Sequence, residues 1–235
     1  MSRTVVRGER ITPTVRTFST VKQGYEESEN EDACAADPVS LRFAVADGAS
    51  TAARSDVWSR LLVEAFVHEH LDPTDPGTRR ELSSRWLAAV WRADLAWFAQ
   101  EKLSGGSAAT FVGLTFSDET YRVHAVGDSC LFHLRGDRVL LAGPMFDPDE
   151  FDRFPELLRT SSESRGGDAV WEAVGTHLSG DVFVLATDAV AATFLTACST
   201  EGRVPAHYVD TPSELVDRAR NEGRNDDMTM CVIEI

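Results

Sequence analysis

Apolar and polar positions along the chain change their spacing several times. A short apolar run at residues 41–46 ends at Asp47-Gly48, which predicts a buried strand that leads into a turn. Two stretches then carry apolar residues at helical spacing, 56–72 and 82–105, and they predict two consecutive helices. Their apolar stripes include Trp58, Trp86 and Trp97, which we expect in the core.

The pattern then switches to strands. Residues 110–116 and 121–126 predict one hairpin, and residues 130–134 and 138–142 predict a second. A mixed segment at 143–180 predicts an irregular or partly helical insertion. The remaining predicted elements are a strand at 181–186, a helix at 189–198, a helix from a capping box at Thr211 to Gly223, and a strand at 229–235. Paired helices followed by hairpins indicate an α+β fold with antiparallel sheet.

Composition indicates a globular protein with an acidic surface. The 235 residues are 43% hydrophobic and 26% charged, and no linker divides them, so we expect a single domain over residues 1–235. Asp and Glu number 38 against 23 Lys and Arg, a net charge of -15, which argues against nucleic acid and anionic membrane as partners. Residues 1–10 lack the apolar core of a secretory signal, and the four cysteines are far apart. A cytoplasmic location follows as the expectation.

Three aspartates follow apolar strands. Asp47 comes after FAVA, Asp128 after HAVG and Asp188 after VLAT, so each carboxylate can emerge at the end of a rigid strand. Converging carboxylates, with a backbone carbonyl where glycine allows close approach, suit hard divalent cations. The alternative is structural, because an aspartate after a strand is commonly a turn former or a helix N-cap.

Two further acidic clusters make the pattern specific. Asn30-Glu31-Asp32-Ala33 precedes the first predicted strand, and residues 224–229 precede the last. With these clusters the sequence resembles the protein phosphatase 2C family, the metal-dependent serine/threonine phosphatases. The matching segments, in the order of the family's motifs, are GYEESENEDA (24–33), FAVADGAS (43–50), GSAATFVGLTF (106–116), VHAVGDSCLFHLRGDRV (123–139), GDVFVLATDAV (180–190) and RNDDMTMCVIEI (224–235).

The resemblance implies a fold and a metal centre. The family's fold is a four-layer α-β-β-α sandwich with two central antiparallel sheets flanked by helices. Asp47 resembles the aspartate that bridges two Mg²⁺ or Mn²⁺ ions, and the carbonyl of Gly48 is a further ligand. The other positions that resemble the family's metal site are Asp188 and Asp226 as ligands, Asp32 and Glu31 as the pair that holds metal-bound water, and Asp128 at a third, weaker ion of bacterial members.

The resemblance also implies a reaction. Hydroxide generated at the two ions attacks the phosphorus of phosphoserine or phosphothreonine in a protein, and no phosphoenzyme forms. The implied partners are a phosphoprotein substrate and a cognate serine/threonine kinase in bacterial signalling. Nothing in the sequence indicates an oligomeric state.

The chain departs from the family in several places. The arginine that grips the substrate phosphate is replaced by Glu27, and the candidates to replace it are Arg16, Lys22 and Arg54, of which Arg54 follows the DGAS loop. The glycine-rich turn after Asp47 has become Ala49-Ser50, and the segment from 140 to 180 lacks a TxDHS motif. These departures leave two alternatives open, a pseudophosphatase that binds a phosphoprotein or kinase, and a phosphatase for a small phosphorylated metabolite.

Overall fold

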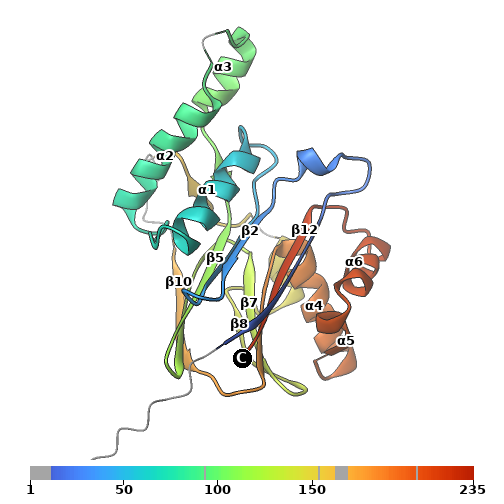
Figure 1. Cartoon of the computed structure of the whole chain (residues 1–235). Coiled ribbons are helices and arrows are strands. Elements are labelled where there is room, and N and C mark those ends of the chain that lie inside the picture. The colour runs from blue at the N-terminus through green and yellow to red at the C-terminus, as the bar shows by residue number, and fades with distance from the viewer. Residues whose placement is uncertain (1–11, 93, 153, 162–168, 205) are drawn as a thin grey trace, which may run out of the picture.

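Two antiparallel sheets form the centre of the molecule (Figure 1). The computed structural model describes residues 12–92, 94–152, 154–161, 169–204 and 206–235. The N-terminal segment 1–10, which the sequence analysis examined for a secretory signal, lies outside these ranges. In strand order the first sheet consists of β1 (Thr14–Thr20), β12 (Met228–Glu234), β11 (Asp181–Ala186), β7 (Cys130–Arg135) and β8 (Arg138–Gly143). The second consists of β10 (Trp171–Thr176), β6 (Thr120–Val126), β5 (Phe111–Ser117), β3 (Arg42–Ala46) and β2 (Ala33–Asp37).

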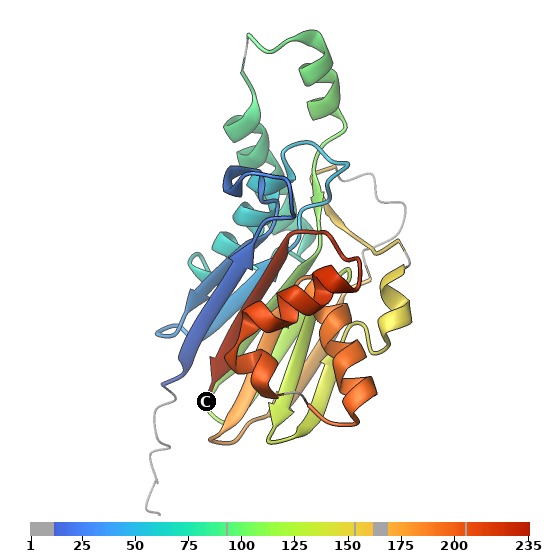
Figure 2. The same cartoon turned by 90° about the vertical axis from the view of Figure 1, so that its right-hand side faces the viewer.

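Helices cover the outer faces of both sheets. On the first sheet lie α4 (Asp188–Glu201), α5 (Ala206–Asp210) and α6 (Pro212–Asn221), as Figure 2 shows. The second sheet is covered by α1 (Ser55–Val67), against which α2 (Pro76–Val90) packs, and α3 (Trp97–Ser104) follows α2. Short 3₁₀ turns at Glu27–Glu29 and Pro148–Asp152 and a two-stranded pair of β4 (Ala108–Ala109) and β9 (Leu158–Arg159) complete the described elements. The predicted α-β-β-α sandwich is confirmed.

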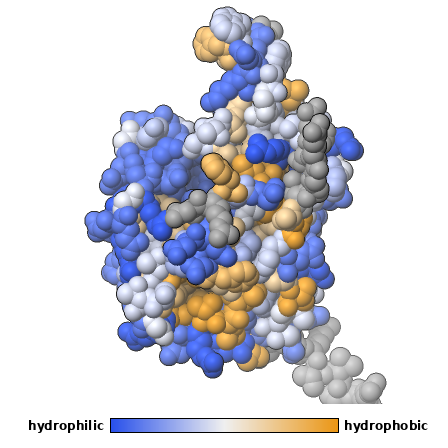
Figure 3. Space-filling view, turned by 180° about the vertical axis from the view of Figure 1, so that it is seen from behind, coloured by the Kyte–Doolittle hydropathy of each residue, from blue (hydrophilic) through white to orange (hydrophobic). Residues whose placement is uncertain are grey.

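The core has three layers of apolar side chains because each sheet alternates its residues between two faces. Between the sheets pack Phe43, Leu114, Phe183 and Ile233, all fully buried. Trp58 and Phe66 of α1 fill the layer under the second sheet, and Phe132 and Phe194 help to fill the layer between the first sheet and α4. Seen from behind, the outer surface is largely hydrophilic, with apolar areas low on that face (Figure 3).

The second predicted helix was wrong in its extent. The pattern predicted one helix from 82 to 105, but α2 ends at Val90, where Trp91 adopts an extended backbone with ψ 134°. Leu82, Trp86 and Val90 are buried, whereas Trp97 is 75% exposed, so its assignment to the core was also wrong. The apolar spacing continues into α3, but α2 and α3 project beyond the sheets (Figure 1), and little of the molecule remains there to cover the stripe.

Both predicted hairpins are confirmed, as β5–β6 and β7–β8. Strands β1, β2 and β10 were not predicted, and β10 lies in the segment expected to be irregular. The helix after Thr211 is present as α6, but the Thr211 side chain makes no capping hydrogen bond, so the capping box was wrong in its details. Within the described residues, no helix is long and apolar enough to cross a membrane.

Candidate functional site

One end of the two-sheet sandwich collects the acidic residues singled out in the sequence. Strands β3, β6 and β11 end just before Asp47, Asp128 and Asp188. Strands β2 and β12 begin just after Asp32 and Asp226–Asp227. The pairs Ala33↔Ala46 and Ala186↔Met230 show that antiparallel neighbours start and stop at the same edge. The topology therefore brings the loops that carry these residues together.

The carboxylates at this acidic end act on one another electrostatically. The pKa of Asp47 is raised well above its usual range by burial and then by the negative charges of four other carboxylates, those of Asp32, Asp188, Asp226 and Asp128. Burial and the charges of Asp128 and Asp226 raise the pKa of Asp188 to about 7. The five predicted aspartates thus share one electrostatic environment.

Asp128 is placed by the glycine before it. Gly127 has a φ of +94°, and a Cβ there would lie 2.7 Å from Thr110 Cγ2 and 2.8 Å from the carbonyl of Glu156, so the turn admits no larger residue. Asp128 is only 4% exposed, and burial raises the pKa of its carboxyl to about 6. Its Oδ1 has no hydrogen-bond partner among the described residues. A buried carboxylate oxygen without a partner is costly unless a cation or water approaches it.

Asp32 is tied to the opposite sheet through Thr187. The Thr187 hydroxyl donates to Asp32 Oδ2 at 3.0 Å and accepts from the backbone N–H of Thr229 at 2.9 Å. Burial raises the pKa of Asp32 well above its usual range, although hydrogen bonds from Thr229 and Thr187 oppose the shift. Its second oxygen, Oδ1, is buried and unpaired within the described part of the chain.

Gly48 is required by a close approach of the backbone. A Cβ at this position would lie 2.7 Å from the carbonyl oxygen of Glu31 and 2.8 Å from Cβ of Ser55. Gly48 also forms an isolated antiparallel bridge with Ala109, while Thr110 N donates to the Asp47 carbonyl at 2.8 Å. The turn after β3 is therefore locked against three neighbouring segments, which fixes where Asp47 leaves the strand.

The Glu31 carboxylate is bound by three neighbouring side chains. Ser55 Oγ donates to Glu31 Oε1 at 2.5 Å, Ser50 Oγ donates to Oε2 at 2.6 Å, and Lys22 Nζ lies 3.3 Å from Oε2. Ser50 belongs to the DGAS sequence, which thus supplies one of these donors. The carboxylate of Glu31 is thus engaged by two hydroxyls and one ammonium group.

Asp227 is a residue that the sequence analysis missed. Only 3% of it is exposed, and its two oxygens accept the backbone N–H groups of Lys22 at 2.9 Å and Glu31 at 2.8 Å. It therefore fastens the segment before β2 to the segment before β12. Two consecutive aspartates before a strand were the available signal, since one of them can bond to backbone while the other faces the site.

The basic candidates lie in different places. Arg54 is 55% exposed in its side chain, and Asp56 holds its guanidinium through two bonds of 2.9 Å. Arg16 lies on β1 opposite Val232, away from the acidic end, and pairs with Glu234 at 2.5 Å and with Asp210. Lys22 lies at the acidic end beside Glu31; burial raises the pKa of Asp226, and the charge of Lys22 opposes that shift.

Arg224 is a basic residue that the sequence analysis also missed. Its positive charge acts to lower the pKa of Asp188, although burial and neighbouring carboxylates outweigh it. Its Nε is buried and has no hydrogen-bond partner in the described ranges. The residue belonged to a quoted motif, but only the folded chain shows that its charge reaches the acidic end.

The donor set fits hard divalent cations in its chemistry. All the donors are oxygens, two buried carboxylate oxygens lack partners, and the carboxylates raise one another's pKa values, so positive charge here would relieve their repulsion. However, no three Asp, Glu, His or Cys side chains of the described residues are placed so that they could hold one metal ion. The ligand shell would have to close around the ion.

Comparison with known proteins identifies the family. A sequence profile of the family described as protein phosphatase 2C matches residues 23–230, and the chain belongs to this family. No curated protein shows significant sequence similarity to the chain.

Several solved structures share the fold. One is PppA, described as a key regulatory component of T6SS in Pseudomonas aeruginosa, with 21% identity, a TM-score of 0.64, and coverage of 95% of this chain and 98% of that one. The catalytic domain of the serine/threonine protein phosphatase PstP, in complex with two manganese ions, has 20% identity, a TM-score of 0.63 and coverage of 95% and 99%. Stp1 from Staphylococcus aureus has 14% identity, a TM-score of 0.63 and coverage of 100% and 99%.

Proposed function

We propose that the protein is a Mg²⁺- or Mn²⁺-dependent phosphatase that hydrolyses phosphoserine or phosphothreonine in proteins. The observation that carries the proposal is the convergence of Asp32, Asp47, Asp128, Asp188 and Asp226 at one end of the sandwich, where charges within the group raise several of their pKa values. The match to the family over residues 23–230 supports both this activity and a single catalytic domain spanning 1–235. The partners we propose are a phosphoprotein substrate and a cognate serine/threonine kinase.

In this proposal the chain supplies the ligands. Asp47 and the Gly48 carbonyl, together with Asp188 and Asp226, would hold two divalent cations, and Asp128 would help to hold a third, weaker one. When bound, such cations activate water at neutral pH and offset negative charge on the phosphoryl oxygens. Asp32, oriented by Thr187 and Thr229, would hold the attacking water through its free Oδ1. The PstP catalytic domain, which shares the fold, contains two manganese ions, and this supports the cation count.

We propose Arg54 as the residue that binds the substrate phosphate. It lies four positions after Ser50, the last residue of the DGAS sequence, and one terminal nitrogen, Nη1, is outside the two bonds to Asp56. Arg224 is a second candidate, because its charge already acts on Asp188 and its Nε is unpaired. Substitution of each arginine by Ala distinguishes them. The substitution that removes the phosphate contact should raise KM, and substitution of the other arginine should leave KM unchanged.

A second function, that of a pseudophosphatase which binds a phosphoprotein or kinase without turnover, has specific support. Glu27 stands where the family has its phosphate-binding arginine, and the Glu31 carboxylate is engaged by Ser50, Ser55 and Lys22. The retained aspartates favour the enzyme, because loss of catalysis would begin with the metal ligands.

One assay separates the two functions. Wild type and Asp47→Ala are compared on p-nitrophenyl phosphate and on a phosphothreonine peptide, each with Mn²⁺ and with EDTA, and Asp137→Ala in the exposed β7–β8 turn is the matched control. The enzyme hypothesis predicts turnover that requires Mn²⁺, falls about 100-fold or more in Asp47→Ala and is unchanged in Asp137→Ala. Wild-type turnover no higher than that of Asp47→Ala on both substrates would contradict the enzyme hypothesis and favour the pseudophosphatase function. Hydrolysis of small phosphoesters alone would indicate a metabolite phosphatase.

A further inference from the structure

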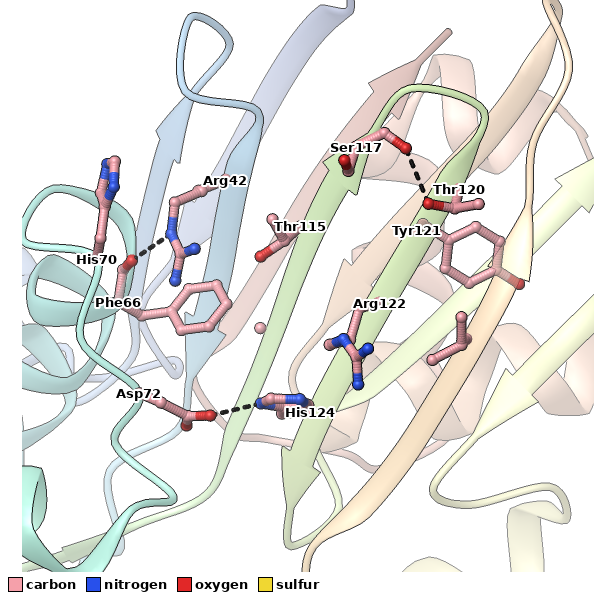
Figure 4. Close-up of a pocket in the computed structure, with 12 residues that line it drawn as sticks. Arg42, Phe66, His70, Asp72, Thr115, Ser117, Thr120, Tyr121, Arg122 and His124 are labelled. Atoms are coloured by element: carbon pink, nitrogen blue, oxygen red, sulfur yellow. Dashed lines mark hydrogen bonds and ion pairs between the residues drawn. The ribbon is translucent and has the colours of Figure 1, made fainter.

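A second polar pocket lies on the second sheet, away from the acidic end. It has a volume of about 480 Å³ and opens where α1 stops covering the sheet (Figure 4). Arg42 at the start of β3 lines this pocket, whereas Asp47 follows the end of the same strand. At about 3.3 Å per residue the two positions are about 17 Å apart along the strand. The pocket is therefore separate from the proposed catalytic site.

Strand register builds the floor of the pocket. Arg42 on β3 pairs with Thr115 on β5, Thr115 pairs with Arg122 on β6, and Arg122 pairs with Val174 on β10. Directly paired residues project from the same face of a sheet. Two arginines thus flank one hydroxyl, their backbones about 10 Å apart because neighbouring strands are about 4.8 Å apart. Figure 4 shows the Thr115 side chain between the two guanidinium groups.

Arg42 is oriented by its neighbours. Its Nε donates to the carbonyl oxygen of Phe66 at 2.7 Å, and its guanidinium lies 4.2 Å from the centre of the Phe66 ring. This arrangement uses one of the five N–H donors and leaves the terminal nitrogens for a ligand. Arg122 makes no hydrogen bond or ion pair to another side chain within the described ranges, so its fork is also available.

The acidic side chains near the pocket are those of Asp72 and Glu172. Asp72 lines it, but its Oδ2 lies 2.7 Å from His124 Nδ1 and its Oδ1 accepts from Thr74. Glu172 pairs with His124 across β6 and β10, so it projects from the same face of the sheet, but it is exposed and is not among the residues that line the pocket. Among the residues that line the pocket, two arginines stand against one carboxylate, that of Asp72, which His124 contacts, in a chain of net charge -15.

We propose that this pocket binds a small phosphomonoester. Two forked guanidinium groups and a hydroxyl match the oxygens of a phosphate, and two positive charges match its charge of about -2 better than that of a carboxylate. Phe66 and Val174 provide apolar contact for the body of the ligand, and the volume is in the range of small-molecule sites. The proposal goes beyond the proposed phosphatase activity and does not depend on it.

The test is calorimetric titration with phenylphosphonate, which cannot be hydrolysed, in EDTA. Without cations the acidic end repels a phosphonate, so binding reports on the second pocket. We expect wild type to bind one equivalent, Arg122→Gln to bind about tenfold more weakly or worse, and Thr115→Val to bind more weakly. The matched control is Arg138→Gln, an exposed arginine on edge strand β8, which should bind like wild type.

Several results would overturn the proposal. They are absence of binding to wild type, equal binding to Arg122→Gln and wild type, or an equal loss in Arg138→Gln. Phenylacetate bound as tightly as phenylphosphonate would replace the phosphate assignment with a carboxylate. A phosphothreonine peptide bound more tightly than phenylphosphonate would overturn the small-ligand assignment. Turnover in the p-nitrophenyl phosphate assay is a separate readout, so either proposal can fail alone.

Discussion

Individual residues at the acidic end are fitted closely to their neighbours, and Gly48 shows this most directly. Its missing side chain leaves room for the Glu31 carbonyl and Ser55, which approach to within 2.8 Å of where a Cβ would be. We predict that Gly48→Ala lowers the free energy of unfolding by about 1–3 kcal/mol, because backbone and a helix residue would both have to move. Urea denaturation measures this.

Gly105→Ala is the matched control for that prediction. At Gly105 the nearest atom to an added Cβ is the Lys102 carbonyl oxygen at 3.4 Å, which is ordinary contact, and φ is -70°. Its free energy of unfolding should change by less than about 1 kcal/mol. Equal effects of the two substitutions would mean that the close approach at Gly48 is not what requires glycine.

His124 and Asp72 predict a pH dependence of stability. The contact with Asp72 raises the pKa of His124 despite partial burial, while hydrogen bonds from His124 and Thr74 outweigh burial and lower the pKa of Asp72 to about 2. A raised histidine pKa contributes stability that is present below the unfolded pKa of about 6.5 and is lost as pH rises through the folded value.

We therefore predict that His124→Gln costs on the order of 1 kcal/mol of unfolding free energy at about pH 5.5 and less at about pH 8. Urea denaturation at the two pH values measures the difference. Arg138→Gln, an exposed arginine on edge strand β8, is the control, and its effect on the unfolding free energy should be the same at the two pH values. A cost for His124→Gln that grows with pH would contradict the assigned ion pair.

The aspartates of the site were predictable because each follows or precedes an apolar strand in a motif. Asp227, Arg224 and the partners of Glu31 were not, since their roles arise from contacts between segments far apart in sequence. Asp227, for example, bonds to the backbone of Lys22 and Glu31, about 200 positions away. Local pattern carries no information about such pairings.

At the scale of elements, strands with buried faces on both sides were predicted, whereas the edge strands β1, β2 and β10 were not; the edge strand β8 was predicted from its hairpin with β7. β5, β7, β11 and β12 are nearly continuous apolar runs. β1 and β10 lie at sheet edges and alternate with polar residues, and β2 is rich in alanine, which has low strand propensity. These three strands are specified by their neighbours, to which they add backbone hydrogen bonds.

Helix α1 is joined to the short strand β9 by one buried side chain. Trp58 is fully buried, and its Nε1 donates to the Leu158 carbonyl at 2.8 Å. We predict that Trp58→Phe costs about 1–3 kcal/mol of unfolding free energy, since the carbonyl loses its donor in the interior. Hydrogen exchange should also rise in β4 and β9, the pair that this bond anchors.

Trp97→Phe is the control for Trp58→Phe. Because Trp97 is 75% exposed, the substitution should change the unfolding free energy by less than about 0.5 kcal/mol and leave exchange in β4 and β9 unchanged. A larger loss from Trp97→Phe than from Trp58→Phe would restore the core position that the helical spacing had suggested for Trp97.

At the scale of the whole molecule, the order of the motifs predicted the architecture correctly, whereas the element boundaries were predicted less accurately. Six segments in register implied two sheets with flanking helices, and the break between α2 and α3 does not disturb that arrangement. Part of the net charge of -15 has a structural location, because five aspartates of the chain gather at one end of the sandwich. The second pocket, with Arg42 and Arg122, lies at the opposite end of β3 from these aspartates.

The central claim is that the acidic end binds divalent cations, and calorimetric titration with Mn²⁺ tests it most directly. The account predicts that wild type and Asp137→Asn bind two Mn²⁺ ions per chain, and that Asp47→Asn, at the position proposed to bridge the ions, loses binding. Circular dichroism would establish that each variant is folded. Absence of Mn²⁺ binding to wild type, or unchanged binding to folded Asp47→Asn, would contradict the account.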